Sequence, residues 1–504
     1  MERSSLSTHR HSELVIALVY PLGTDRELVI RALRNHLAKF DYATRVVRVS
    51  EQFERLNELQ KGLKDSPEYN RIATRMEAGN KARELAKRAD FATLAAISAV
   101  SKTRSSGGDP EPFLRTVLLI DSLKRPEEVA MLRRIYGAGF FLLGVFASEA
   151  TRRRYLTDDK NIPAVDAATL MDRDLDEIDA YGQRTTSTFH LADVFVSLDN
   201  LCAESDYKSE IWRFLDLVFN HPYHTPTRDE NAMFLAYAAS FRSGDLSRQV
   251  GAAVTSASGD VIAVGCNDVP RYGGGLYWPG QDDQRDWRRG HDSNHMRREQ
   301  IISEVLSALE VPNDQRDDFR TRLAEASPLK DITEYGRAVH AEMEALLAAG
   351  RTGCSPLGGT LYTTTFPCHN CARHIVAAGV RRVVYVEPYP KSKAGELHAD
   401  SISLTDQGES HREDRLSFEP FVGVGPRRYV DLFSIGLGGG RHKRRKSGPD
   451  ILQWSPSGES EVRIPMLPTS YLDRERFAAD EIAETLGLLG EPSSAPIDEE
   501  SEHS

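Results

Sequence analysis

The sequence predicts an α/β protein in which a first domain with a parallel sheet is followed by a second, α/β/α domain. Short apolar runs at residues 14–20, 116–121 and 140–145 have the length and composition of buried strands. Helix-like segments at residues 26–40 and 126–136 alternate with these runs, and strands that alternate with helices indicate a parallel sheet. A second series of short strands and helices occupies the other half of the chain, which predicts the second domain.

Turn and cap residues separate the elements of the first half. Residues 21–25 form a turn after the first strand, and Asp25 is placed to cap the helix that follows. The strand at 116–121 ends in the carboxylate of Asp121. Residues 51–105 are expected to be mainly helical and to grade into a loop at 101–108.

The second half contains the strands and helices that surround two short motifs. The expected strands are 251–255, 261–265, 359–365 and 382–386, and the expected helices are 231–241, 299–309, 340–350 and 371–379. The first motif is His340-Ala341-Glu342, and the second is Pro367-Cys368-His369-Asn370-Cys371. Both motifs are expected where a helix begins.

The side chains of His340, Cys368 and Cys371 are a set of ligands suited to Zn²⁺. Three such ligands leave a fourth position for water, and Glu342 is then a carboxylate beside that water. H-x-E … P-C-x-x-C is the signature of the zinc-dependent nucleobase deaminases, in which the metal activates water and the glutamate transfers protons. The partial positive charge of a helix N-terminus helps to hold the two cysteines as thiolates.

A purely structural zinc site is the alternative interpretation. Such a site needs a fourth protein ligand, and His369 and Cys354 are the nearest candidates. Neither candidate accounts for a glutamate two residues after His340. The pattern therefore favours a catalytic site with Glu342 as the proton shuttle.

Four sequence blocks in this order resemble the deoxycytidylate (dCMP) deaminases. They are Arg-Ser-Gly-Asp-Leu-Ser-Arg-Gln-Val-Gly-Ala at 242–252, Gly-Cys-Asn-Asp-Val-Pro at 265–270, His-Ala-Glu at 340–342 and Phe-Pro-Cys-His-Asn-Cys-Ala at 366–372. The resemblance implies that Asn267 contacts the sugar, whereas Asn267 alone would be explained as a turn residue after a strand. It also implies a substrate-binding role for Arg242, Ser243, Ser247 and Gln249.

Two further segments lie near these blocks. Residues 271–335 form a long polar insertion whose carboxylates are suited to binding a cation or closing over a substrate, although acidic loops are commonly just solvated. Lys391 and Ser392 are suited to phosphate binding; the alternative is that Lys391 and Lys393 are simply an exposed lysine pair.

The first half resembles the core of the P-loop nucleotide kinases, with Asp121 in the place of a strand-end aspartate that binds metal. The G-x-x-x-x-G-K-[ST] pattern is absent after Gly23, so ATP hydrolysis is not expected. The resemblance implies a degenerate domain in which Gly23, Thr24, Asp25 and Asp121 bind a regulatory nucleotide. A domain that serves only as a scaffold is the alternative.

The pairing of two such domains resembles the anti-phage dCTP/dCMP deaminases of bacteria, and the resemblance extends to residues 387–393 and 420–426. It implies conversion of dCTP and dCMP to dUTP and dUMP, and depletion of dCTP during viral infection. It further implies a homo-oligomer in which the N-terminal half gates the C-terminal half in response to a nucleotide or RNA.

Length and composition set the remaining expectations. The 504 residues are expected to form domains at 1–215 and 216–435, followed by a partly disordered extension at 436–504. The basic cluster at 441–446 is expected to be solvated, with RNA contact as the alternative. Five cysteines without a disulfide framework, no secretory signal and no apolar stretch of bilayer length predict a cytoplasmic protein.

Two other function classes remain open at this point. A deaminase of cytosine in single-stranded DNA or RNA uses the same zinc chemistry. Such an enzyme needs a basic groove with aromatic stacking platforms, which a net charge of −11 disfavours. The third class is a nucleotide-sensing regulatory protein in which the N-terminal half dominates.

Overall fold

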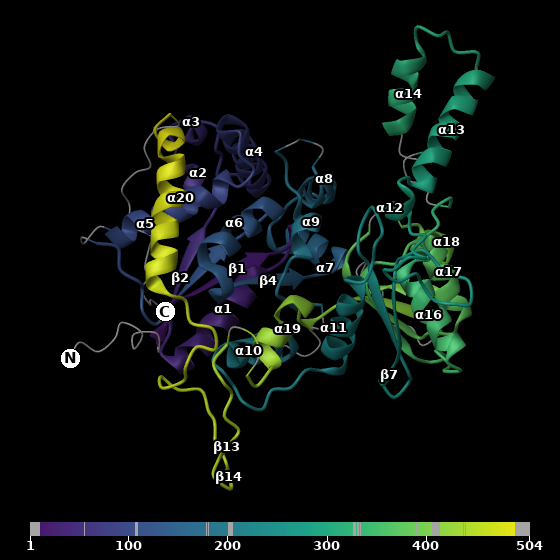
Figure 1. Ribbon diagram of the computed structural model, residues 1–504. Coiled ribbons are helices and arrows are strands. Elements are labelled where there is room, and N and C mark those ends of the chain that lie inside the picture. The colour runs from purple at the N-terminus through teal and green to yellow at the C-terminus, as the bar shows by residue number, and fades with distance from the viewer. Residues whose placement is uncertain are drawn as a thin grey trace. The chain divides into compact units, whose positions relative to one another are not determined.

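In the computed structural model, the first half of the chain folds around a six-stranded sheet with the order β12-β5-β4-β1-β3-β2 (Figure 1). The strands are β1 Leu14–Val19, β2 Ala43–Arg48, β3 Thr116–Asp121, β4 Phe140–Phe146, β5 Val194–Ser197 and β12 Gly423–Val424. Strands β2, β3, β1, β4 and β5 are mutually parallel, and β12 pairs antiparallel with β5. The parallel sheet predicted from the alternating pattern is therefore confirmed. Every residue of β1 and β3 is buried, because helices cover both faces of a parallel sheet.

The structure describes residues 11–54, 56–105, 109–177, 179, 181–199, 205–325, 329, 332, 334–389, 392–405, 414–436, 438 and 440–488. The helices associated with the first sheet are α1 Arg26–Leu37, α2 Glu51–Glu54, α3 Asn57–Gln60, α4 Glu68–Ala86, α5 Phe91–Ser105, α6 Pro126–Tyr136, α7 Glu149–Arg154, α8 Ala164–Leu175, α9 Thr185–Phe189, α10 Ser205–Val218, α19 Tyr429–Phe433 and α20 Pro468–Leu488. Asp25 caps α1 as predicted, because its carboxylate accepts the backbone N–H of Glu27.

The second half of the chain folds around a separate six-stranded sheet with the order β10-β11-β9-β8-β6-β7. Its strands are β6 Gly251–Thr255, β7 Val261–Cys266, β8 Thr360–Thr365, β9 Arg382–Glu387, β10 Ile402–Leu404 and β11 Leu416–Pro420. Strands β7, β6 and β8 pair antiparallel, and β8, β9, β11 and β10 pair in parallel. The helices are α11 Arg228–Ser240, α12 Asp286–Arg289, α13 Ser293–Ala308, α14 Arg316–Glu325, α16 Ala341–Arg351, α17 His369–Ala377 and α18 Ala394–Leu397.

The insertion predicted at 271–335 contains α12, α13 and α14. Helices α13 and α14 form a pair that extends away from the sheet (Figure 1), and Arg320 of α14 bonds Glu299 of α13 at 3.1 Å. The insertion is thus a folded part of the second domain where the structure describes it.

The chain divides into two compact units whose limits differ from the expected boundaries at 215/216 and 435/436. Unit 1 contains Met1–Glu230 and Val422–Ser504, and unit 2 contains Asn231–Thr405 and Glu409–Phe421. The C-terminal segment belongs to unit 1 because its apolar residues Val462 and Ile464 join the core of the first sheet. The disorder expected at the end of the chain concerns residues outside those described.

Helix α20 is attached to unit 1 by a buried ion pair. The guanidinium of Arg104 lies between the carboxylates of Glu13 and Glu475, at 2.6 and 2.7 Å. Tyr471 of α20 also donates to Glu13 at 2.7 Å. Helix α5, which carries Arg104, continues through Ser105 and so includes residues 101–105, where a loop was expected.

One residue of the basic cluster contradicts the expectation that the whole cluster is solvated. Lys443 is 1% exposed, and burial lowers the pKa of its ammonium group to about 7. The cluster leads into the short hairpin of β13 Lys446–Ser447 and β14 Asp450–Ile451. Within the described residues, none of the helices combines the length and the apolar character needed to cross a lipid bilayer.

Candidate metal-dependent active site

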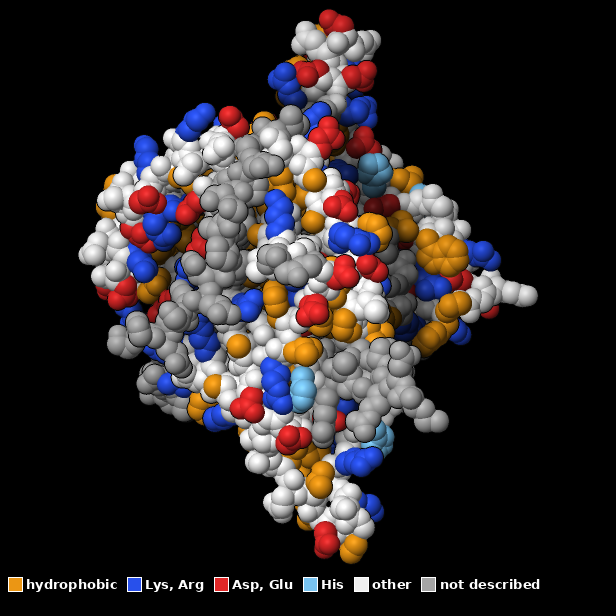
Figure 2. All heavy atoms as spheres, turned by 90° about the vertical axis from the view of Figure 1, so that its left-hand side faces the viewer, with side chains coloured by type: hydrophobic (Ala, Val, Ile, Leu, Met, Phe, Trp, Pro, Cys, Tyr) orange, Lys and Arg blue, Asp and Glu red, His pale blue; other side chains and the backbone are white. Residues whose placement is uncertain are grey.

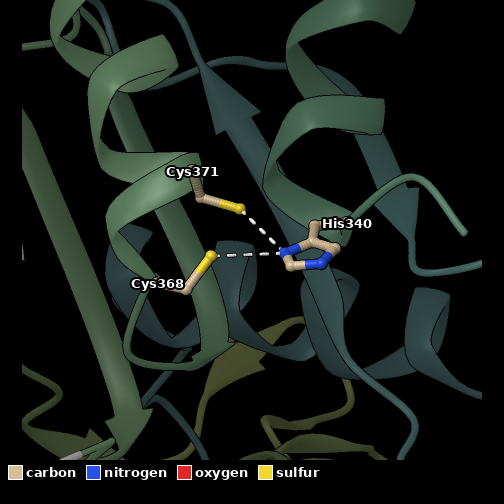
Figure 3. Close-up of side chains that lie close together, drawn as sticks. All are labelled: His340, Cys368 and Cys371. Atoms are coloured by element: carbon tan, nitrogen blue, oxygen red, sulfur yellow. Dashed lines mark hydrogen bonds between the residues drawn. The ribbon is translucent and has the colours of Figure 1, made fainter. Parts of the chain in front are cut away.

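The three predicted metal ligands converge at the N-termini of two neighbouring helices in unit 2 (Figure 3). His340 is the N-cap of α16, Cys368 is the N-cap of α17, and Cys371 lies in the first turn of α17. His340 Nδ1 lies 3.4 Å from Cys368 Sγ and 3.3 Å from Cys371 Sγ. The sequence motif therefore corresponds to a real cluster of donor atoms.

The spacing of these atoms fits a zinc ion. With Zn–S bonds of about 2.3 Å and Zn–N bonds of about 2.0 Å, tetrahedral ligands are separated by about 3.5 Å. The three donor atoms all lie within 4.8 Å of one another, and these three residues are the whole of this group among the described residues. A set of one imidazole and two thiols with one open position is the arrangement of catalytic zinc sites.

The electrostatics of the cluster favour the ligand form of Cys368. A hydrogen bond from the Cys371 thiol lowers the pKa of the Cys368 thiol to about 4, and His340 acts in the same direction. The hydrogen bond to Cys368 raises the pKa of His340 to about 9. Cys368 is therefore a thiolate at neutral pH, which is the form that binds metal.

Glu342 lies in the first turn of α16, beside the ligands and outside their set. It is 4% exposed, and its Oε2 accepts the Cys371 thiol at 3.3 Å. Burial raises the pKa of the Glu342 carboxyl. A buried carboxylate with a raised pKa, next to a metal position, is suited to accepting and returning a proton.

These residues line a cavity of about 300 Å³. His340, Glu342 and Cys368 are on its wall, together with the aromatic rings of Phe366 and Tyr389. The volume is at the lower end of the range for small-molecule sites. The cavity brings a metal site, an acid–base group and apolar surface together.

The predicted sugar contact, Asn267, is on the cavity wall, but both ends of its amide also hold the backbone. Its Nδ2 donates to the Arg248 carbonyl at 2.9 Å, and its Oδ1 accepts the Val250 N–H at 2.8 Å. Asn267 therefore fixes the loop that leads into β6. An amide has two N–H donors and two acceptor lone pairs, so a substrate contact remains available to it.

The other predicted substrate-binding residues are divided by the structure. Ser247 lines the cavity. Ser243 and Gln249 instead hold the loop through bonds to Asn267 O and Ser243 O. Arg242 and Ser392 do not line the cavity but hold neighbouring segments. Arg242 donates to the carbonyls of residues 276 and 277, and Ser392 donates to the carbonyl of residue 367. Lys391 lies outside the described residues.

The predicted nucleotide-binding residues of unit 1 are at the end of the first sheet. Asp121 accepts Tyr20 Oη at 2.5 Å and pairs with Arg26 at 3.1 Å, and it is buried. Thr24 Oγ1 donates to the Pro21 carbonyl. A Cβ atom added at Gly23 would lie 2.8 Å from the Cβ of Arg152, so a side chain there would collide with that residue. Asp25 is engaged in the cap of α1.

Sequence reasoning did not single out Arg248 and Arg337, whereas it described the carboxylates of the insertion as suited to binding a cation or closing over a substrate. Arg248, Asp286, Asp292 and Arg337 all line it. Arg337 stands three residues before His340, so proximity to the motif was a usable signal. Asp286 is one of the insertion carboxylates for which such a role was expected, and the fold of the insertion brings it to the cavity wall.

A three-ligand metal site with a neighbouring buried carboxylate defines a hydrolytic zinc centre as the class of site in unit 2. Residues 226–387 match the family described as the cytidine and deoxycytidylate deaminase zinc-binding region. The second half of the chain therefore contains a domain of this family. The zinc cofactor predicted from the sequence is confirmed by this match together with the His/Cys donor set.

Relatives carry the same type of domain. The chain is 46% identical over 57 residues to the deoxycytidylate deaminase of Enterobacteria phage T4, which is 11% of this chain and 30% of that protein. It is 28% identical over 180 residues to the probable deoxycytidylate deaminase of Drosophila melanogaster, which is 35% of this chain and 69% of that protein. The chain thus matches less than a third of the length of the phage relative. A crystal structure of dCMP deaminase from the cyanophage S-TIM5 in complex with dCMP and dUMP covers 40% of this chain and 100% of that chain, with 17% identity and a TM-score of 0.23.

Proposed function

We propose that this protein is a zinc-dependent hydrolytic deaminase of deoxycytidine nucleotides, which converts dCMP and dCTP to dUMP and dUTP. The observation that carries the proposal is the position of Glu342, buried beside the His340, Cys368 and Cys371 triad and facing the same cavity. A structural zinc site has no use for such a carboxylate. The four sequence blocks and the relatives named above supply the substrate class.

The reaction adds water to C4 of the cytosine ring, breaks the C4–N4 bond and releases ammonia. Zinc, when bound by the triad, supplies a nucleophile at neutral pH because it lowers the pKa of water to about 7. Glu342 accepts one proton from the attacking water and delivers it to ring nitrogen N3. It then accepts the remaining hydroxyl proton and delivers it to the departing amine, so that C4 becomes a carbonyl and ammonia leaves. Phe366 and Tyr389 give the base an apolar wall, and Asn267 keeps the 248–250 loop in place.

We also propose that the deaminase acts in antiviral defence by depleting dCTP, with unit 1 as its regulatory part. This proposal is supported by the resemblance of the two-domain arrangement to anti-phage deaminases. Nucleotide pools in cells that express the protein test it directly: dCTP is expected to fall and dUMP to rise after phage challenge. Unchanged pools in challenged cells that contain the active protein would contradict this role.

A substrate panel separates the proposed function from deamination of nucleic acid. Zinc-loaded protein is incubated with dCTP, dCMP, CTP, cytidine and a cytosine-containing oligonucleotide, and products are separated by chromatography. Uracil is expected in the deoxynucleotides. Uracil in the oligonucleotide alone would overturn the proposal. On the face shown in Figure 2, which is the left-hand side of Figure 1, the described Lys and Arg side chains are interspersed with Asp and Glu.

A further inference from the structure

The insertion of unit 2 forms part of the wall of the active-site cavity and is fixed there by a buried arginine. Arg285 is 6% exposed. Its guanidinium makes a bidentate pair with Asp283, at 2.9 and 2.7 Å, and reaches Asp268 at 3.4 Å. Asp268 is itself buried and follows Asn267 at the end of β7. The segment around Arg285 is therefore anchored to the floor of the cavity.

This anchor places the next residue, Asp286, against Arg337. Arg337 Nη1 donates to Asp286 Oδ1 at 2.6 Å and to the Gln284 carbonyl at 3.0 Å. Both charged side chains line the cavity, and Arg337 precedes the ligand His340 by three residues. Only Nη1 of Arg337 bonds to described residues, so the N–H groups of Nε and Nη2 are available to donate to a ligand.

On the cavity wall, two of the carboxylates have more of their hydrogen-bonding positions occupied than the arginine side chains do. Asp245 accepts the backbone N–H groups of Ser247 and Arg248, and Asp292 accepts those of Asn294 and His295. Each of these carboxylates thus already has donors.

The cations on the same wall are less committed. Arg248 is half exposed, and its contacts are a 3.7 Å approach to Glu387 and a position 5.7 Å from the centre of the Tyr389 ring. With Arg337, it presents to the cavity guanidinium donors that the described residues do not use, whereas Asp245, Asp286 and Asp292 on the same wall each already accept a hydrogen bond. Such an arrangement favours an anionic ligand, and a guanidinium fork matches the geometry of phosphate oxygens.

We propose that Arg337, held by Asp286 of the insertion and assisted by Arg248, binds the phosphate of the nucleotide substrate and thereby selects nucleotides over nucleosides. The inference rests on the proposed function. It assigns the recognition of the substrate phosphate to Arg337 of the same cavity. The insertion then acts in specificity, since it determines the direction of the Arg337 side chain.

Equilibrium binding to a catalytically silent protein tests this role without relying on turnover. In the zinc-loaded Glu342→Ala background, dCMP, dCTP and deoxycytidine are titrated by calorimetry against proteins with and without Arg337→Gln. We expect the Kd for dCMP and dCTP to rise at least tenfold and the Kd for deoxycytidine to rise less than threefold. Arg337→Lys, which keeps the charge without the fork, is expected to give an intermediate Kd for dCMP.

The matched control is Arg320→Gln, which removes an ion pair of the same kind between α14 and α13. It is expected to leave the Kd for dCMP within twofold. Zinc content and melting temperature, measured for every variant, identify any that fails to fold; Arg337→Lys then carries the comparison.

Unchanged dCMP binding in folded Arg337→Gln, or an equal loss for dCMP and deoxycytidine, would overturn the inference. Failure of the proposed function gives a different result, since the wild-type protein would then leave both dCMP and dCTP unchanged.

Discussion

Each of the two units holds a buried carboxylate, Asp121 at the end of β3 in unit 1 and Glu342 in the first turn of α16 in unit 2, and the two have different partners. In unit 2, the Glu342 carboxylate has the Cys371 thiol as its side-chain partner and faces a cavity. In unit 1, the Asp121 carboxylate accepts Tyr20 and pairs with Arg26. A carboxylate can transfer protons or bind metal when it is free to exchange partners, whereas one held by a guanidinium and a phenol contributes to stability. The partners of the two carboxylates therefore predict different roles for them.

The largest expected effect is the loss of catalysis when Glu342 is changed. Glu342→Gln removes the proton shuttle with little change in shape, and deamination of dCMP is expected to fall by about 10³-fold or more. Zinc content, measured by metal analysis, is expected to stay near one ion per chain. Glu344→Gln is the matched control on the same helix, because Glu344 pairs with Arg351 at 2.5 Å instead of facing the triad. Turnover near the wild-type rate in Glu342→Gln would refute the shuttle.

Removal of a metal ligand is expected to abolish zinc binding and activity together. His340→Ala and Cys371→Ala each leave two of the three ligands, so zinc per chain is expected to fall by at least tenfold after dialysis. His374→Ala is the control, because its ring is exposed on α17 and bonds the Asn370 carbonyl. Full zinc retention in both ligand variants would show that the ion is held elsewhere.

The corresponding change in unit 1 is expected to affect stability. Asp121→Asn removes the charge that pairs with Arg26 and leaves a partly buried guanidinium, at a cost of about 3 kcal/mol of unfolding free energy. Thermal unfolding measures this loss. ATP hydrolysis is expected to be absent in both the parent and the variant, since the P-loop lysine is missing and Asp121 is already paired. Robust ATPase activity in the parent that is lost in Asp121→Asn would contradict the assignment of a structural role to Asp121.

A substitution of Asn267 tests whether its side chain holds the 248–250 loop or whether it is only a turn residue. Asn267→Ala leaves the Val250 N–H and the Arg248 carbonyl without their partner, and we expect a loss of about 1–3 kcal/mol of stability. The same change is expected to raise the KM for dCMP, because the displaced loop carries Arg248 and Ser247. Wild-type stability and KM in this variant would restore the turn interpretation.

The smallest expected effect is a pH dependence that belongs to unit 1. Burial lowers the pKa of His221 to about 4, and the neighbouring His224 acts in the same direction, while Asp216 opposes both. The backbone N–H groups of Tyr223 and His224 donate to His221 Nδ1, which favours the neutral ring. Because the unfolded chain takes up this proton near pH 6.5, the contribution is present above pH 6.5 and is lost as pH falls towards 4. Melting temperatures over that range are expected to fall less steeply in His221→Asn, and equal slopes would exclude this group.

Local patterns predicted the strongly apolar strands and the metal centre, but not β2, β5, β10, β11 or β12. Residues close together in the sequence determine the apolar runs of β1, β3 and β8 and the caps of α1 and α16. Their positions were therefore predictable. The triad was predictable because its ligand types and spacing are specific to one chemistry.

Features that depend on distant contacts were not predictable in this way. The C-terminal segment joins unit 1 through Arg104, which meets Glu475 from 371 residues away in the chain. Lys443 lies in a run of charged residues and is buried all the same. The contact of Arg337 with Asp286 of the insertion joins residues 51 positions apart in the chain. Such long-range pairs leave no periodic signal in the sequence.

The most direct test of the central claim is the fate of dCMP in the presence of the zinc-loaded full chain, followed together with metal content by chromatography and metal analysis. The account predicts stoichiometric dUMP and ammonia from wild-type protein, and none from Glu342→Gln protein that carries the same amount of zinc. If both proteins leave dCMP unchanged at full zinc loading, or if both convert it equally, the assignment of Glu342 and its metal site is contradicted.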